Sequence, residues 1–128
     1  MAISVVNTPT FAPMAERMQF SQAVKSGSFL FCSGVTGTDA SGKAPAELDA
    51  EFRMAFDLLK MVLAEAGASM TDIVEMTTYH VDMENTMPSF FPVRGEYLSA
   101  PWCAWSAIGV SSLFGGAKVE IRAVAELG

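Results

Sequence analysis

The amino-acid sequence predicts an α+β fold in which two helices pack on one face of a mixed β-sheet. Two patterns predict it. Within residues 117–126, apolar and polar side chains alternate with a period of two, as in a strand with one face on a core and one on a wetter surface: Val119, Ile121, Ala123 and Ala125 against Lys118, Glu120, Arg122 and Glu126. Residues 46–66 carry apolar side chains at three- and four-residue spacing, as an amphipathic helix does. At 128 residues and 13.7 kDa, we expect a single domain spanning residues 1–128.

The composition of the chain limits the kinds of molecule that it is expected to bind. The net charge of −6 comes from scattered carboxylates, and the eight Lys and Arg do not cluster, so we expect no nucleic-acid partner. No apolar segment approaches the roughly 18 residues of a membrane span, and the N-terminus lacks the pattern of a signal peptide. These features predict a cytoplasmic protein with no membrane partner. Hydrophobic residues form 51% of the chain and charged ones 17%, which indicates that part of the surface meets other copies.

The first third of the chain is expected to form a β-hairpin. Residues 1–19 are predicted to be extended or irregular, because their prolines disfavour a regular helix. Strands are predicted at 21–25 and 29–36 around the turn Ser26-Gly27-Ser28. The second strand is apolar on both faces, with Phe29, Phe31 and Ser33 on one and Leu30 and Cys32 on the other. This pattern indicates a sheet covered by helices on one side and by another subunit on the other.

A surface loop, a helix and a strand follow. Residues 36–45 are rich in turn-forming residues and lack the pattern of a phosphate-binding loop. Residues 46–66 form the strongest predicted helix, and Gly67 stops it. Residues 73–82 are then predicted to be a strand.

The last third is expected to hold a second helix and two strands. The helix is predicted at 85–98; with Ser89 as N-cap, Pro92 would fall in its first turn, where a missing N–H costs little. Residues 87–92 could instead be a loop. Strands are predicted at 99–110 and 117–126.

The single histidine and the two cysteines are the first candidates for chemistry. His80 lies on a predicted strand, where a lone histidine is most often structural, but its ring titrates near neutral pH and could carry a proton. Cys32 and Cys103 lack metal-ligand spacing, so we expect no metal and no cofactor, and interpret both as small buried hydrophobes. Cys103 could be a nucleophile only if its thiolate were stabilised, and no neighbour in sequence carries positive charge.

Several segments together resemble the RidA (YjgF-type) family of imine and enamine deaminases, over residues 19–127. They are Gln19-Phe20-Ser21-Gln22-Ala23-Val24, Phe31-Cys32-Ser33-Gly34, Val119-Glu120-Ile121 and Ala123-Val124-Ala125. Residues 78–85 and 99–110 are more similar to the YjgH branch. The resemblance implies a chorismate-mutase-like fold and a homotrimer with three clefts, each lined by two subunits.

The resemblance also implies roles for individual residues. Glu120 matches the glutamate that is thought to hold and activate the attacking water. Trp105 stands where the family's active deaminases have an arginine that binds the substrate carboxylate, a task suited to a planar guanidinium. Phe20 replaces a tyrosine, and Glu84 replaces an asparagine.

Further contacts to a substrate are expected from the strand segments. Ser33 and Gly34 would line the cleft, and the backbone amides near Gly34 and Ala107 would hold developing charge. Alternatives remain for the two most informative side chains. Glu120 could pair with Arg122 or Lys118 on an exposed face, and Trp105 could belong to the core, to a subunit contact or to the cleft.

The sequence thus predicts a small-molecule hydrolase or deaminase acting on an imine, enamine or related substrate. Glu120 and His80 are the candidate catalytic residues. Phe20, Ser33, Gly34, Glu84, Trp105 and Ala107 are the candidate substrate-binding residues. The alternative is a non-catalytic ligand-binding or regulatory trimer, because Trp105 cannot supply the missing charge. Ribonuclease activity is disfavoured by the acidic charge and the absence of a basic stripe.

Overall fold

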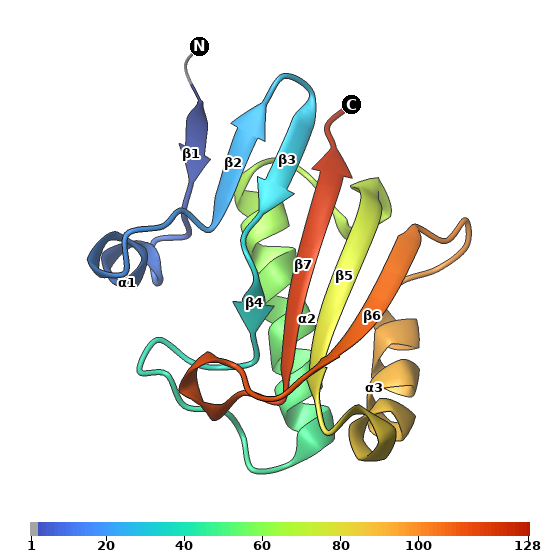
Figure 1. Cartoon of the computed structure of the whole chain (residues 1–128). Helices are drawn as coiled ribbons and strands as arrows, with labels where there is room; N and C mark the ends of the chain where they lie inside the picture. The colour runs from blue at the N-terminus through green and yellow to red at the C-terminus, as the bar shows by residue number, and fades with distance from the viewer. Residues whose placement is uncertain (1–2) are drawn as a thin grey trace.

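The computed structural model describes residues 3–128 and contains one mixed seven-stranded β-sheet with two long helices behind it (Figure 1). The strands are β1 (Ser4–Val6), β2 (Ala23–Ser26), β3 (Phe29–Cys32), β4 (Val35–Thr36), β5 (Ile73–Val81), β6 (Ala104–Val110) and β7 (Val119–Glu126). The helices are α1 (Ala12–Arg17), α2 (Leu48–Glu65) and α3 (Met83–Tyr97), with short 3₁₀ turns η1 (Met70–Asp72) and η2 (Phe114–Gly116). The predicted α+β class is confirmed.

The last strand of the chain lies in the middle of the sheet. The order is β1-β2-β3-β7-β5-β6, and β4 also pairs with β7. Every pairing is antiparallel except that of β5 with β6, which α3 connects as a crossover (Figure 1). Strand β6 is therefore one edge of the sheet, two strands away from β7.

The hydrophobic core fills the space between the sheet and its helices. The predicted apolar side of α2 is buried there, including Phe52 and Phe56. Phe90 of α3 meets Phe52 edge-on, with ring centroids 5.4 Å apart, and stacks on Phe56 at 5.7 Å. Leu30 of β3 is fully buried beneath them, as the alternation of its strand predicts. These contacts fix both helices to one face of the sheet.

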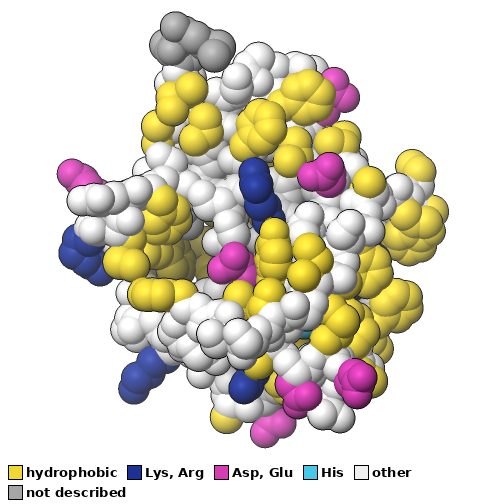
Figure 2. Space-filling view, in the orientation of Figure 1, with side chains coloured by type: hydrophobic (Ala, Val, Ile, Leu, Met, Phe, Trp, Pro, Cys, Tyr) yellow, Lys and Arg dark blue, Asp and Glu magenta, His cyan; other side chains and the backbone are white. Residues whose placement is uncertain are grey.

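The other face, here called the open face, is not covered by α2 or α3, which both lie behind the sheet (Figure 1). The strand registers place Val5, Val24, Phe31 and Val124 in one row across it. Val5 is 54% exposed and Phe31 41% exposed. Figure 2 shows hydrophobic side chains gathered on this face over β1, β2 and β3. That another subunit covers it stays a prediction.

Two of the sequence-based expectations for helices are wrong. Residues 1–19 include the helix α1, because Pro13 sits in its first turn, where proline fits. Helix α3 begins at Met83 and contains Pro88 and Pro92, so Ser89 is not its N-cap and residues 87–92 are not a loop. The start is set by Asp82, whose left-handed backbone (φ 55°, ψ 51°) turns the chain from β5 into the helix. Burial of Phe90 helps to offset the two missing N–H groups.

The predicted strand 29–36 is interrupted, and this break shapes the site described below. Phe31 pairs with Val124, whereas Val35 pairs with Ile121, so four residues of one strand advance against three of β7. The extra residue makes an irregularity of the β-bulge kind at residues 33–34. The predicted strand 99–110 is likewise shorter, starting at residue 104. No helix within residues 3–128 has the length and apolar character to cross a membrane.

Candidate functional site

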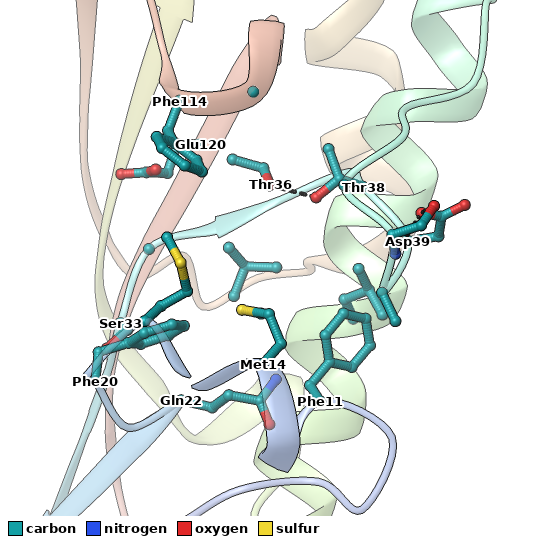
Figure 3. Close-up of a pocket in the computed structure, with 18 of the residues that line it drawn as sticks. Phe11, Met14, Phe20, Gln22, Ser33, Thr36, Thr38, Asp39, Phe114 and Glu120 are labelled. Atoms are coloured by element: carbon teal, nitrogen blue, oxygen red, sulfur yellow. Dashed lines mark hydrogen bonds between the residues drawn. The ribbon is translucent and has the colours of Figure 1, made fainter. Parts of the chain in front are cut away.

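A cavity of about 360 Å³ opens beside the break between β3 and β4. Its wall comes from the region of α1, the β3–β4 junction, the loop after β4, Leu58 of α2, η2 and β7, and it includes Phe20, Ser33, Gly34 and Glu120. Figure 3 shows Phe20 and Ser33 on one side of this space and Thr36, Thr38 and Asp39 on the other. Figure 2 shows the same region as a hollow lined by hydrophobic side chains. The structure thus brings four of the predicted site residues into one cavity.

Glu120 lies against Gly34, and the contact explains the glycine. A Cβ added at Gly34 would stand 2.5 Å from Glu120 Oε2, closer than real Cβ contacts allow. The bulge and the missing side chain therefore make room for the carboxylate. Among residues 3–128, Glu120 has no ion pair, since both salt bridges belong to Arg53, and no side-chain hydrogen bond. The alternative in which Arg122 or Lys118 neutralises Glu120 is not what the structure shows.

Most polar side chains around Glu120 already make hydrogen bonds within the protein. Ser33 Oγ donates to the carbonyl oxygen of Ser21 at 2.6 Å, so its remaining capacity is to accept a hydrogen bond. Gln22 Oε1 accepts from the backbone N–H of Thr8 at 2.7 Å. Hydrogen bonds from Ser41, and then from Lys43, hold the pKa of Asp39 below its usual value. Glu120 is consequently the carboxylate in this wall left free to bind water or a ligand.

Sequence reasoning missed a large part of this wall. Phe11 and Met14, from the start of α1, face the cavity in Figure 3, as does Phe114 of η2, which is 79% exposed. Arg17, at the end of α1, is the one Lys or Arg lining the cavity within the described residues. The missed signal was the apolar spacing of Phe11, Met14 and Met18, which a proline in the same segment obscured.

The remaining candidates for substrate binding lie at the other end of the sheet. Trp105 and Ala107 belong to the edge strand β6, and Glu84 is exposed in the first turn of α3. The Trp105 indole N–H donates to Thr78 Oγ1 at 3.0 Å, and its ring stacks on Phe91 with centroids 6.1 Å apart. Within one chain, these three residues do not line the cavity that holds Glu120.

His80 lies on the helix-covered face, away from Glu120. It is fully buried; its Nε2 is 2.7 Å from Thr78 Oγ1, and Phe90 meets its ring edge-on with centroids 4.7 Å apart. Burial lowers the pKa of His80, which keeps the ring neutral. This placement does not support the expected role in proton transfer, because a ligand touching Glu120 is separated from His80 by the sheet.

The side chains that could bind a metal ion do not form a cluster in the described part of the chain. Within residues 3–128, no three His, Cys, Asp or Glu side chains are grouped so that they could hold a metal ion.

Comparison with known proteins identifies the family to which the chain belongs. Residues 10–127 match the sequence profile of the family described as Endoribonuclease L-PSP, which includes the RidA proteins. The chain belongs to this family.

The relatives place it among the YjgH-like members. It is 36% identical over 110 residues to the RutC family protein YjgH of Escherichia coli K12, covering 85% of this chain and 83% of that protein. It is 30% identical over 107 residues to the 2-iminobutanoate/2-iminopropanoate deaminase of Dermatophagoides farinae, covering 82% and 83%. The solved structure of protein YjgH superposes with a TM-score of 0.93 at 30% identity, covering 99% and 98% of the chains.

Proposed function

We propose that the protein hydrolyses the C=N bond of an imine, or of the imine tautomer of an enamine, with Glu120 orienting the attacking water. The observation that carries the proposal is the unpaired Glu120 carboxylate beside Gly34 in the wall of the cavity. Family membership supports it, because one relative is named as an imine deaminase. The proposed site of action is the cytoplasm.

The reaction needs one base and one acid in succession. Water attacks the imine carbon as Glu120 takes one of its protons, and the carbon–nitrogen double bond becomes single. The carboxyl group then returns the proton to nitrogen. Glu120 then takes the proton of the carbinolamine hydroxyl and passes it to the amino group; the carbon–nitrogen bond breaks as the carbonyl double bond forms, and ammonia leaves. Backbone amides near Gly34, and near Ala107 of a neighbouring copy, hold the charge that develops in between.

The distribution of the predicted residues supports a cleft shared by two copies in a homotrimer. Phe20, Ser33, Gly34 and Glu120 line one cavity, whereas Trp105, Ala107 and Glu84 lie at the opposite edge of the same sheet. One chain cannot bring both groups to one ligand, but the β6 edge of a neighbour could complete the cavity of its partner. A stable trimer would have a mass of about 41 kDa, three times 13.7 kDa, measurable by light scattering.

The presence of Trp105 affects which class of imine we expect the protein to prefer. Its ring is held by Thr78, by Phe91 and by the Arg94 guanidinium 3.8 Å from the ring centroid, and the indole itself carries no charge where the family's active deaminases have a guanidinium. We therefore expect a flatter or less charged imine to be preferred over a free 2-imino acid. The alternative function, a ligand-binding or regulatory trimer without turnover, is favoured by the same substitution.

The test is hydrolysis of imines generated in the assay by an amino-acid or amine oxidase, with ammonia release as the readout. Glu120→Gln should lower kcat/KM by about 10²- to 10⁴-fold, whereas Glu126→Gln, on the same strand and face, should not change it. Turnover that persists in Glu120→Gln contradicts the proposal. Ligand binding without turnover in the unmodified protein supports the alternative.

A further inference from the structure

Arg94 of α3 is a buried cation without a carboxylate partner. It is 6% exposed, and both salt bridges within residues 3–128 belong to Arg53. Its guanidinium carbon lies 3.8 Å from the centroid of the Trp105 ring, and its Nε has no hydrogen-bond partner. A buried charge of this kind is costly unless an anion lies nearby.

The group that Arg94 does reach is the thiol of Cys103. Nη2 of Arg94 lies 4.0 Å from Cys103 Sγ, which is long for a hydrogen bond but close for two charges. Burial lowers the pKa of the Arg94 guanidinium, and the Cys103 sulfur acts in the opposite direction. Cys103 is half-buried rather than enclosed, so reagents can approach it.

A small cavity of about 70 Å³ gives access to this sulfur. Cys103 lines it together with Tyr97, Ser99 and Thr71. This space holds about two water molecules at liquid volume, so it suits a small reagent. Of the other ionisable groups nearby, Tyr97 directs its hydroxyl to Asp57 at 2.8 Å, and Asp72 of η1 caps Ser69.

We propose that Cys103, beside the buried guanidinium of Arg94, is a reactive cysteine and that its small cavity is a site of oxidation by hydrogen peroxide. The thiolate sulfur attacks one peroxide oxygen, so an S–O bond forms as the O–O bond breaks. The sulfur loses two electrons and becomes a sulfenic acid, and the peroxide leaves as hydroxide, which solvent protonates. This site lies at the α3–β6 edge and does not depend on the hydrolysis assigned to Glu120.

The second cysteine supplies an internal control. Cys32 of β3 is 1% exposed, and burial raises the pKa of its thiol to about 11. The two thiols of one molecule therefore differ in access, because Cys103 is half-buried and lines a cavity whereas Cys32 is enclosed. Any reagent that oxidises cysteines without selection would label Cys32 and Cys103 alike.

The experiment treats the full chain with hydrogen peroxide at pH 7 and traps sulfenic acid with dimedone, with each cysteine quantified by peptide mass spectrometry. Cys103 should be labelled at least about tenfold faster than Cys32. Arg94→Gln should slow labelling of Cys103 by about fivefold or more, Arg94→Lys should retain most of it, and the matched control Arg122→Gln should leave it unchanged.

A comparison that needs no variant completes the test. If Arg94 activates the thiol, Cys103 reacts faster in the folded protein than in the same chain unfolded in urea, although folding partly buries it. Equal or slower reaction in the folded protein overturns the proposal. So does an unchanged rate in an Arg94→Gln protein that folds, as judged by circular dichroism.

Discussion

Polar side chains on the two faces of the β-sheet differ in burial and in access to the cavity. On the helix-covered face, Thr78 and His80 are fully buried and bonded to each other. On the open face, Glu120 is half-buried and has no partner within residues 3–128, although Arg122 follows two residues later on the same face. His80 Nε2 is bonded to Thr78 Oγ1, whereas its Nδ1 has no hydrogen-bond partner within the described residues; burial keeps the ring neutral and on the face away from the cavity, which favours a structural role. Glu120, whose unpaired carboxylate lines the cavity, is the better indicator of function.

The largest effect should come from removing a core ring, which tests how much of the stability lies on the helix-covered face. Phe90→Ala should lower the free energy of unfolding by about 3–5 kcal/mol, because Phe90 is fully buried against Phe52 and Phe56. Its neighbour Phe91, 59% exposed, is the matched control, and Phe91→Ala should cost less than about 1.5 kcal/mol. Urea unfolding measures both; similar losses would contradict the comparison.

A substitution on the open face should affect catalysis more than folding. Gly34→Ala places a methyl group against Glu120 Oε2 and must displace the carboxylate, so imine hydrolysis should fall by about 100-fold. That loss corresponds to about 2.7 kcal/mol in activation free energy. Gly95→Ala in α3, where a Cβ meets nothing within 4 Å, should leave the rate unchanged. Full activity of Gly34→Ala would remove Glu120 from the mechanism.

The buried His80 should make the free energy of unfolding depend on pH. Its folded-state pKa is lowered from 6.5 by burial, so the unfolded chain takes up the proton first as pH falls. Stability is therefore present above pH 6.5 and decreases as pH drops toward the folded-state pKa, by less than about 1 kcal/mol at pH 6. His80→Gln should lack this dependence. Urea unfolding at pH 7.5, 6.5 and 5.5 checks it, and parallel pH profiles for the two proteins would contradict it.

The smallest effect on folding should come from the apolar row of the open face. Phe31 is 41% exposed in the single chain, so Phe31→Ser should change the unfolding free energy of a monomer by about 1 kcal/mol or less. If copies of the chain cover this row, the same change should convert a 41 kDa species into 13.7 kDa monomers in light scattering. An unchanged oligomer would place the subunit contact elsewhere.

Periodicity predicted the regular parts of this fold because burial on one face imposes a repeat that can be counted. The alternation of Leu30 and Phe31 and the apolar side of α2 both follow from it. The start of α3 could not be predicted. Its prolines argue against a helix locally, and the burial of Phe90 against α2 outweighs them.

The candidate site could be predicted only in part, because its geometry also depends on contacts between distant segments. The segment that carries Ser33 and Gly34 was recognisable from sequence, but the bulge that sets Gly34 against Glu120 depends on pairing with β7. Arg94 gave no sequence signal at all. Its importance arises from burial beside Trp105 of β6 and beside Cys103, which directly precedes that strand.

The central position of β7 has a consequence for synthesis. No strand from β1 to β4 pairs with β5 or β6 in the described chain, so only residues 119–126 join the two halves into one sheet. A nascent chain that has emerged as far as β6 would thus hold two separate sets of strands with unpaired edges, which favour association with other chains. Completion of the sheet, and of the wall that contains Glu120, waits for the last strand to be made.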